Sequence, residues 1–165
     1  MEKIMAEKVI DVTLASFTNT GTRSVAPYGF ISARSVRAVD DEQVFASGLL
    51  YDVEKGKPIH SSGVLSLKAG NSLTYNSTQR LSISHFGASE SGGFNQMLLI
   101  FSGLMQLIVV TGGTNETHYV PSREKVPFDE LEGSMNISVP YRCQFEDQVC
   151  KFEANYTVSV ISSSG

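Results

Sequence analysis

The sequence predicts an all-β protein built from antiparallel strands. Helical periodicity is scarce, whereas apolar and polar residues alternate with period two in many segments. These segments are rich in Val, Ile, Thr, Tyr and Phe, and clusters of Gly, Asn, Asp and Ser separate them. Because antiparallel strands must protect their edges, we expect about eight of them to close into an up-and-down barrel. The interior of a barrel of this size is either filled by side chains or holds one small ligand. A two-sheet sandwich is the alternative.

The first half of the chain contains alternating segments that end at turn-rich clusters. Asp52–Lys57 predicts a turn between two of these segments, and Ala69–Asn71 ends the next one. The strands expected here are Lys8–Phe17, Tyr28–Val39, Gln43–Tyr51, Ile59–Leu67 and Leu73–Phe86.

The longest apolar run, from Phe94 to Val110, predicts two strands rather than one helix. Polar residues interrupt the run, and it is shorter than the ~20 apolar residues that a membrane-spanning helix needs. A break at Ser102-Gly103 divides it into the expected strands Phe94–Phe101 and Leu104–Thr111.

The stretch Tyr119–Gly133 predicts a long loop. Pro121 and Pro127 lie within it beside a cluster of charged residues, and proline cannot donate a hydrogen bond to a β-ladder. Within this loop we expect at most one helical turn, at Phe128–Leu131.

The C-terminal segments form the clearest expected hairpin. Apolar residues alternate with polar ones on both sides of Glu146-Asp147, so one face meets the core and the other meets water. The pairing places Cys143 opposite Cys150. The sequence is compatible with either a cross-strand disulfide or two reduced thiols at this pair. The core-facing residues are Met135, Ile137, Val139, Tyr141, Cys143, Phe145, Cys150, Phe152, Ala154, Tyr156, Val158 and Val160.

Length and charge limit the organisation and the partners. A chain of 165 residues fits a single domain that folds without a metal or a disulfide scaffold. We expect residues 1–8 to form an N-terminal segment that can act as a lid, 9–161 the barrel, and 162–165 a tail. The net charge of −4 disfavours nucleic acid and membranes as partners. The first residues lack the apolar core of a signal peptide, so we expect a cytoplasmic protein.

Short motifs along the chain resemble the allene oxide cyclase-like barrel superfamily. Within it, the sequence is most similar to the small bacterial spirotetronate and spirotetramate cyclases. The resemblance covers roughly residues 8–160 and departs from the family pattern after Thr114, where members continue with an aromatic-glycine strand. The motifs are Leu50-Tyr51-Asp52, Gly56, Ser61-Ser62-Gly63, Leu73-Thr74-Tyr75, Leu81-Ser82-Ile83-Ser84 and Thr111-Gly112-Gly113-Thr114.

This resemblance implies an antiparallel barrel with an apolar cavity, assembled as a homodimer. It also implies a cofactor-independent cyclase of polyketide natural-product biosynthesis. Such an enzyme is Diels-Alderase-like and catalyses the intramolecular [4+2] cycloaddition of a linear polyene. Two other uses of the same fold stay open. One is a non-catalytic, lipocalin-like carrier of small hydrophobic ligands, and the other is an allene-oxide-cyclase or dirigent-type protein.

The residues themselves allow this chemistry. A cycloaddition needs a pocket that fixes the diene over the dienophile, which supplies up to ~7–11 kcal/mol, and donors that polarise a carbonyl group. It needs no metal and no cofactor. The candidate catalytic residues are Asp11, Tyr75 and His85. The candidate substrate-binding residues, which could equally pack a core, are Phe94, Met97, Phe101, Met105, Met135, Tyr141, Phe152 and Tyr156.

Asp11 and the histidines each have two interpretations. Asp11 lies in an apolar strand, where it is either a buried cavity carboxylate with a raised pKa or a solvent-facing residue beside inward-facing neighbours. The first interpretation resembles the acidic cavity residue of plant allene oxide cyclases. His85 is either a donor to a substrate carbonyl or a surface residue. Because His60, His85 and His118 lack metal-ligand spacing, we expect no metal site.

Overall fold

The protein is all-β and antiparallel, as the sequence predicts. The computed structural model describes residues 5–37, 40–86, 97–111, 114–127, 134–145 and 148–164, with side chains over 9–34, 46–81, 99–102, 134–142 and 151–161. Within these ranges there are strands and no helix, and so no helix that could cross a membrane. The strands are β1 (Met5–Asn19), β2 (Val25–Arg37), β3 (Asp40–Val53), β4 (Ser72–Phe86), β5 (Met97–Thr111), β6 (Thr114–Pro127), β7 (Ser134–Phe145) and β8 (Gln148–Ser164).

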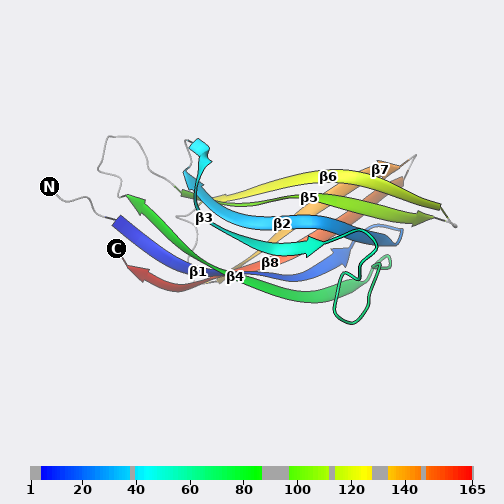
Figure 1. Cartoon of the computed structure of the whole chain (residues 1–165), viewed down its shortest axis with the longest axis horizontal. Helices are drawn as coiled ribbons and strands as arrows, with labels where there is room; N and C mark the ends of the chain where they lie inside the picture. Colours follow the sequence, from blue (N-terminus) through cyan, green and yellow to red (C-terminus); the bar gives the residue numbers. More distant parts are fainter. Residues whose placement is uncertain are drawn as a thin grey trace.

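The strands form two four-stranded sheets, ordered β4-β1-β8-β7 and β3-β2-β5-β6 (Figure 1). An up-and-down order would pair β1 with β2, but β1 lies between β4 and β8, and β2 lies between β3 and β5. The expected up-and-down order is therefore wrong. The connection after β1 explains the difference, because the N–H groups of Thr20 and Gly21 both donate to the carbonyl of Lys151 on β8. These bonds hold the connection beside β8 instead of folding it into a hairpin.

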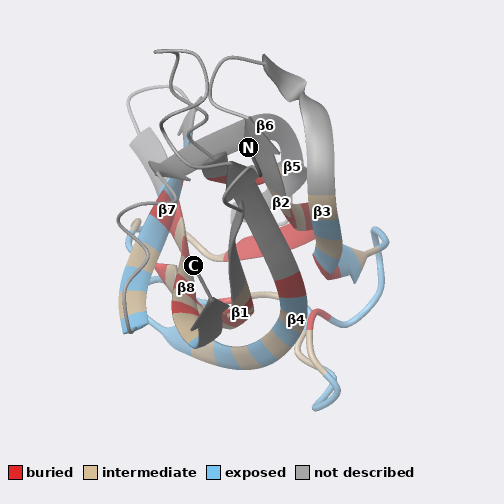
Figure 2. Cartoon of the chain, turned by 90° about the vertical axis from the view of Figure 1, so that its left-hand side faces the viewer, coloured by how far each residue is buried: buried red, intermediate tan, exposed pale blue. Residues whose placement is uncertain are grey.

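The space between the sheets is filled by side chains from both of them. Phe17 on β1 packs against Tyr51 on β3 with ring centroids 5.1 Å apart, and Phe101 on β5 packs against Tyr156 on β8 at 4.4 Å. All four side chains are buried. Figure 2 shows buried residues on strands of both sheets. Over the described side chains, the interior is therefore a packed aromatic and aliphatic core, and the enclosed cavity expected from the sequence is not seen there.

Asn19 holds three chain segments together at the end of β1. It is fully buried, and its side-chain Nδ2 donates to the carbonyls of Arg23 (2.6 Å) and Leu67 (3.0 Å). Its Oδ1 accepts from the N–H of Gly21 at 3.0 Å. A buried polar side chain is stable only when its hydrogen bonds are made, so Asn19 fixes the loops around it.

We expect Asn19→Ala to lower the free energy of unfolding by about 2–3 kcal/mol, because it leaves buried backbone groups without partners. Urea unfolding followed by circular dichroism measures this loss. Lys55→Ala, at an exposed position, serves as the control and should change the stability by less than about 0.5 kcal/mol. Equal stability of the two variants would show that Asn19 is not the organising residue.

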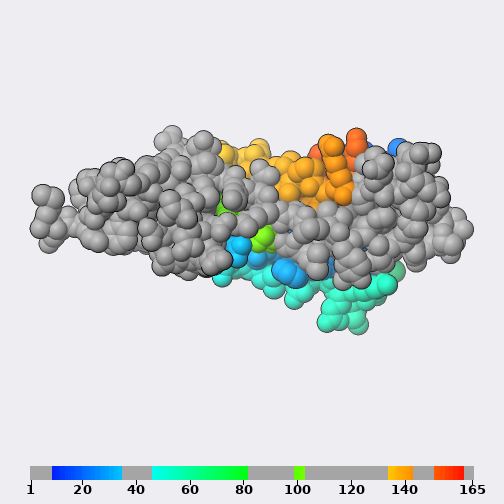
Figure 3. Space-filling model, turned by 90° about the horizontal axis from the view of Figure 1, so that it is seen from above, coloured from blue at the N-terminus to red at the C-terminus, as the bar shows by residue number. Residues whose placement is uncertain are grey.

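The expected strand Ile59–Leu67 is wrong. Residues 54–71 form a loop that projects from one side of the molecule (Figures 1 and 3). The bridge Val25↔Leu67 and backbone hydrogen bonds of Gly70 and Asn71 with Asn19 join its end to the strands. The loop folds on itself, because the N–H of Ile59 donates to the Val64 carbonyl at 2.6 Å. Gly63, with φ of 86°, allows the tight turn between them.

Two other expectations about strands are corrected. β5 is one continuous strand, because Ser102 and Gly103 pair with neighbours on both sides, so the break expected there is absent. The loop expected from residue 119 is strand as far as Pro127. Its prolines are tolerated because β6 is an edge strand of its sheet, where one side needs no ladder donor. The helical turn expected at 128–131 lies outside the described residues.

The C-terminal hairpin is confirmed. β7 pairs with β8 in the predicted register, with Cys143 opposite Cys150, although the sulfur atoms lie outside the described side chains. Val139, Tyr141 and Phe152 are buried, and the intervening residues are more exposed. The outer face of this sheet carries hydroxyl and amide groups that bond across the strands. Thr13 bonds to Thr78 at 2.8 Å.

The edges of the two sheets meet where β3 lies beside β4. Nε2 of Gln79 on β4 donates to the carbonyl of Leu49 on β3 at 2.9 Å. A Cβ atom at Gly48 would lie 2.8 Å from Cβ of Gln79, so the close approach of the strands requires glycine at this position. Beyond this contact the strands separate, and the loop 54–71 leaves β3.

Candidate functional site

A cleft of about 400 Å³ lies where β3 and β4 separate, between β4 and the loop 54–71. Its volume is within the range of small-molecule sites, roughly 300–1,000 Å³. One side of the lining is apolar and the other carries polar groups. The lining residues are Val53, Pro58, Ile59, His60, Ser61, Tyr75, Asn76 and Ser77.

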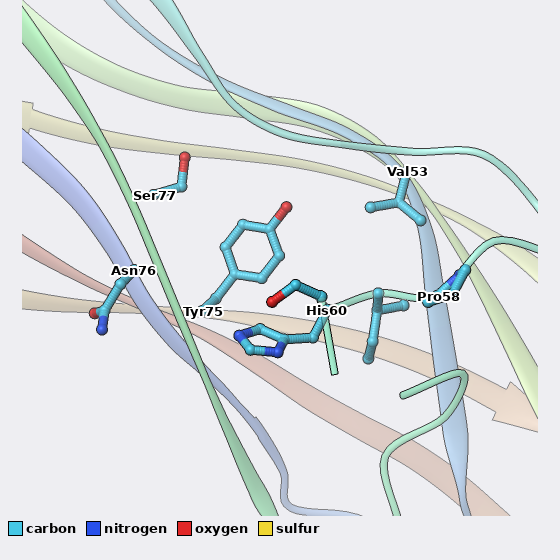
Figure 4. Close-up of a pocket in the computed structure, with 8 residues that line it drawn as sticks. Val53, Pro58, His60, Tyr75, Asn76 and Ser77 are labelled. Carbon is cyan, nitrogen blue, oxygen red and sulfur yellow. The ribbon is translucent and has the colours of Figure 1, made fainter. Parts of the chain in front are cut away.

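Tyr75 and His60 present two aromatic rings to this cleft. Their ring centroids are 6.4 Å apart in an edge-to-face arrangement, and Figure 4 shows both rings between β4 and the loop. Tyr75 is also 5.1 Å from the ring of Tyr51, which belongs to the buried core. The cleft is therefore the place where the aromatic core reaches the surface.

The hydrogen bonds of His60 determine which of its nitrogens can donate. The backbone N–H of Ser62 donates to Nδ1 of His60 at 3.3 Å, and the Ser62 hydroxyl lies 3.1 Å from the same nitrogen. An N–H donor requires a lone pair on Nδ1, so the neutral imidazole carries its proton on Nε2. The ring then has a donor at Nε2.

Asn76 has a left-handed backbone, with φ of 57°. This conformation is uncommon for a residue other than glycine, and asparagine is the type that tolerates it best. It coincides with a shift in the β1–β4 register between Leu14 and Ser16. In Figure 4 Tyr75 points into the cleft and Asn76 to the other side of β4. The irregularity thus lies beside the residue that presents its ring to the cleft, as strained backbone at binding sites often does.

Three tyrosines near the core stay protonated well into the alkaline range. Burial raises the pKa of Tyr51 and Tyr156, and burial followed by the charge of Asp52 raises the pKa of Tyr75. Tyr51 also donates to the carbonyl of Pro27 at 2.5 Å. Tyr75 is therefore a neutral hydroxyl group at physiological pH.

The raised pKa values predict a loss of stability in alkali. A raised folded-state pKa means that the folded protein keeps its protons while the unfolded chain loses them. This contribution to the free energy of unfolding is complete below about pH 10 and declines as the pH rises above it. Absorbance at 295 nm should show Tyr51 and Tyr156 ionising only together with unfolding. Full tyrosine ionisation in a protein that is still folded would contradict this.

Of the predicted catalytic residues, only Tyr75 lies in the cleft. Asp11 is on the outer face of its sheet, where Nε and Nη2 of Arg80 donate to its two carboxylate oxygens at 2.8 and 3.0 Å. The hydrogen bond from Arg80 lowers the pKa of Asp11. The buried carboxylate with a raised pKa is thus wrong, and the solvent-facing interpretation is confirmed. Asp11 faces solvent because side chains alternate between the two faces of β1, and its neighbours Ile10 and Val12 are fully buried on the inner face.

His85 belongs to the opposite end of β4. Its backbone pairs with Ala6, and it is ten residues from Tyr75, or about 30 Å at the rise of a β-strand. The two residues therefore cannot share one site. The side chain of His85 lies outside the described side chains, as do those of Met97 and Met105 on β5, and Phe94 lies outside the described residues.

The other predicted substrate-binding residues pack the core. Met135 is partly buried against it, and the aromatic ones are fully buried and in contact with other rings. Phe152 stacks on Phe17 at 5.1 Å and lies 6.4 Å from Tyr141. Their structural role is therefore the core-packing alternative. The residues that do so are Phe101, Tyr141, Phe152 and Tyr156.

The sequence pattern did not identify the loop half of the cleft. His60 and Ser61 lie in a segment that was expected to be a strand, Ile59–Leu67. That expectation gave no reason to place them beside Tyr75. The signal that could have found them is the density of turn formers around them, Gly56, Pro58 and Gly63. In the described part of the chain, no group of three or more His, Cys, Asp or Glu side chains is placed to hold a metal ion.

The fold and the cleft define an all-β protein with an open, partly aromatic cleft on its surface. Comparison with known proteins finds no match among family models, curated proteins or solved structures.

Proposed function

We propose that the protein is a cofactor-independent cyclase that folds a linear polyene for an intramolecular [4+2] cycloaddition. The proposal places the carbonyl-bearing end of the substrate in the cleft at Tyr75. The observation that carries it is the presence of a neutral phenol and an imidazole opposite an apolar wall. Polyketide biosynthesis is the source of polyenes of this kind, as the resemblance implies.

The proposed mechanism uses position and polarisation. Val53, Pro58 and Ile59 offer an apolar surface against which a flexible chain can fold. Hydrogen bonds from Tyr75 and His60 to a carbonyl oxygen would withdraw electron density from a conjugated alkene and make it a better dienophile. Neither group has to gain or lose a proton during the reaction, which suits a concerted cycloaddition.

We also propose that the two sheets close into a barrel along β3 and β4. The Gln79–Leu49 hydrogen bond and the contact of Gly48 with Gln79 support this, because they join edge strands of different sheets. In this proposal the barrel is the rigid support of the cleft, and the closed seam sets how far the cleft can open.

The test is to incubate the purified protein with a linear tetronate or tetramate polyene and to follow an isomer of unchanged mass by its shifted chromatographic retention. The proposal expects product to form faster than in buffer, and a chelator to leave the rate unchanged. Thr13→Ala, on the outer face, is the control variant and should keep the rate. Product formation at the buffer rate would contradict the proposed activity.

A carrier of small hydrophobic ligands is the second candidate. It is favoured by the openness of the cleft, because Pro58 and Ser61 in its lining are exposed. A cyclase benefits from a closed site that excludes water, whereas a carrier needs access. Tight binding of the polyene without faster product formation would support the carrier over the cyclase.

A further inference from the structure

The two hydrogen-bond donors of the cleft suggest what chemical group it recognises. The phenol of Tyr75 is held protonated by burial and by Asp52, and the imidazole of His60 has its donor at Nε2 because Nδ1 accepts from Ser62. Both rings line the same space. In Figure 4 the Tyr75 hydroxyl points toward Val53 and the His60 ring lies beside the base of Tyr75, so the cleft offers two separate donors next to apolar side chains. Neutral donors in such a place suit the acceptor oxygen of a largely apolar ligand.

We propose that the cleft recognises an uncharged carbonyl group, a ketone, ester or lactone oxygen, through Tyr75 and Nε2 of His60. Ser62 acts as the positioning residue that fixes the proton of His60 on Nε2. The inference rests on the proposed function in placing the ligand in this cleft, but it does not depend on the cycloaddition.

The charges around the cleft explain why the ligand is uncharged. Asp52 and Glu54 carry carboxylates at the end of β3, and Lys55 and Lys57 follow on the loop. These two negative and two positive groups are all exposed and offset one another. The charges of residues 52–57 therefore sum to zero. Asp52, whose charge acts on Tyr75, disfavours a carboxylate beside that hydroxyl.

Three matched ligands test the recognition by isothermal titration calorimetry. They are β-ionone, which is a conjugated ketone, the hydrocarbon in which its carbonyl is replaced by CH₂, and β-ionylideneacetate, which is a carboxylate at pH 7.5. We expect the ketone to bind about tenfold more tightly than either of the others, as one net hydrogen bond allows. Equal affinities, tighter binding of the carboxylate, or no binding of the ketone would each overturn the inference.

Variants assign the donors. Tyr75→Phe keeps the ring and should weaken binding of the ketone about tenfold while leaving the affinity for the hydrocarbon unchanged. The unchanged hydrocarbon affinity also shows that the variant is folded. ¹⁵N NMR of the imidazoles, with His60→Gln to assign the signal, should find the neutral ring protonated on Nε2. Ser62→Ala keeps the backbone N–H that donates to Nδ1, so the ring of His60 should stay protonated on Nε2 in this variant.

Other results would separate this inference from the proposed function. A ketone preference that is undiminished in Tyr75→Phe, or a ring of His60 protonated on Nδ1, would overturn the recognition proposed here. A clear ketone preference without any acceleration of polyene cyclisation would instead sustain the recognition and reject the cyclase.

Discussion

Replacing Phe17 with alanine is expected to lower the free energy of unfolding by about 3–5 kcal/mol, the usual cost of removing a fully buried phenyl ring. Phe17 contacts Tyr51 at 5.1 Å, Phe152 at 5.1 Å and Tyr75 at 5.6 Å. It therefore joins the two sheets and also supports the ring that enters the cleft. This loss of stability has two parts, the lost burial of the phenyl ring and the cavity that the neighbouring rings cannot fill.

Chemical unfolding of the wild type and the variant measures this loss. Ile161→Ala removes another large apolar side chain, but one that is half exposed, and should cost less than about 1 kcal/mol. Because Phe17 supports Tyr75, its replacement should also weaken ligand binding under conditions in which the variant is still folded. A cost for Phe17→Ala no larger than that of Ile161→Ala would contradict the packed core described above.

Replacing Tyr75 with phenylalanine is expected to slow polyene cyclisation by about 100-fold, the lower end of the loss that follows removal of one donor to a reacting oxygen. The ring remains, so substrate should still bind, and the loss should appear in kcat more than in KM. Steady-state kinetics of the proposed reaction measures both constants.

The Tyr75→Phe variant should unfold at nearly the same denaturant concentration as the wild type, because its hydroxyl faces the cleft and not the core. An unchanged kcat in a folded Tyr75→Phe protein would remove the phenol from the proposed mechanism. A large rise in KM with unchanged kcat would show that the hydroxyl binds substrate without polarising it.

The strands with strict alternation could be predicted from the sequence. The hairpin of β7 and β8 is the clearest case, since Val139, Tyr141, Phe152 and Ala154 all point to the core in the structure. Alternation is a local property, and each strand carries it independently of its partners. It therefore identified the faces of these strands correctly.

Which strands pair could not be predicted in the same way. The position of β1 beside β4 depends on contacts between residues far apart in the chain, such as Thr13 with Thr78 and Asp11 with Arg80. Gly103 and Pro121 illustrate the same limit. Each residue type disfavours a strand when judged by its own conformational preference, yet both lie within strands that pair with each other.

The candidate site was predicted only at Tyr75. Its other half comes from a loop whose path is set by the bridge of Leu67 to Val25 and by the bond of Leu67 to buried Asn19. Nothing in the local pattern of His60 to Gly63 encodes that bridge. The aromatic residues chosen as cavity lining were apolar and inward-facing, which is equally the signature of a packed core, and Phe152 and Tyr156 show that role.

The location of the bound ligand tests the central claim most directly. Two-dimensional ¹H–¹⁵N NMR of the protein, titrated with a carbonyl-bearing polyene, reports which residues the ligand affects. Binding in the cleft predicts the largest shifts at Val53, at His60 to Ser62 and at Tyr75 to Ser77, with Thr13 and Thr157 on the outer face unchanged. Shifts that leave the cleft residues unaffected and appear elsewhere would contradict the claim that this cleft is the binding site.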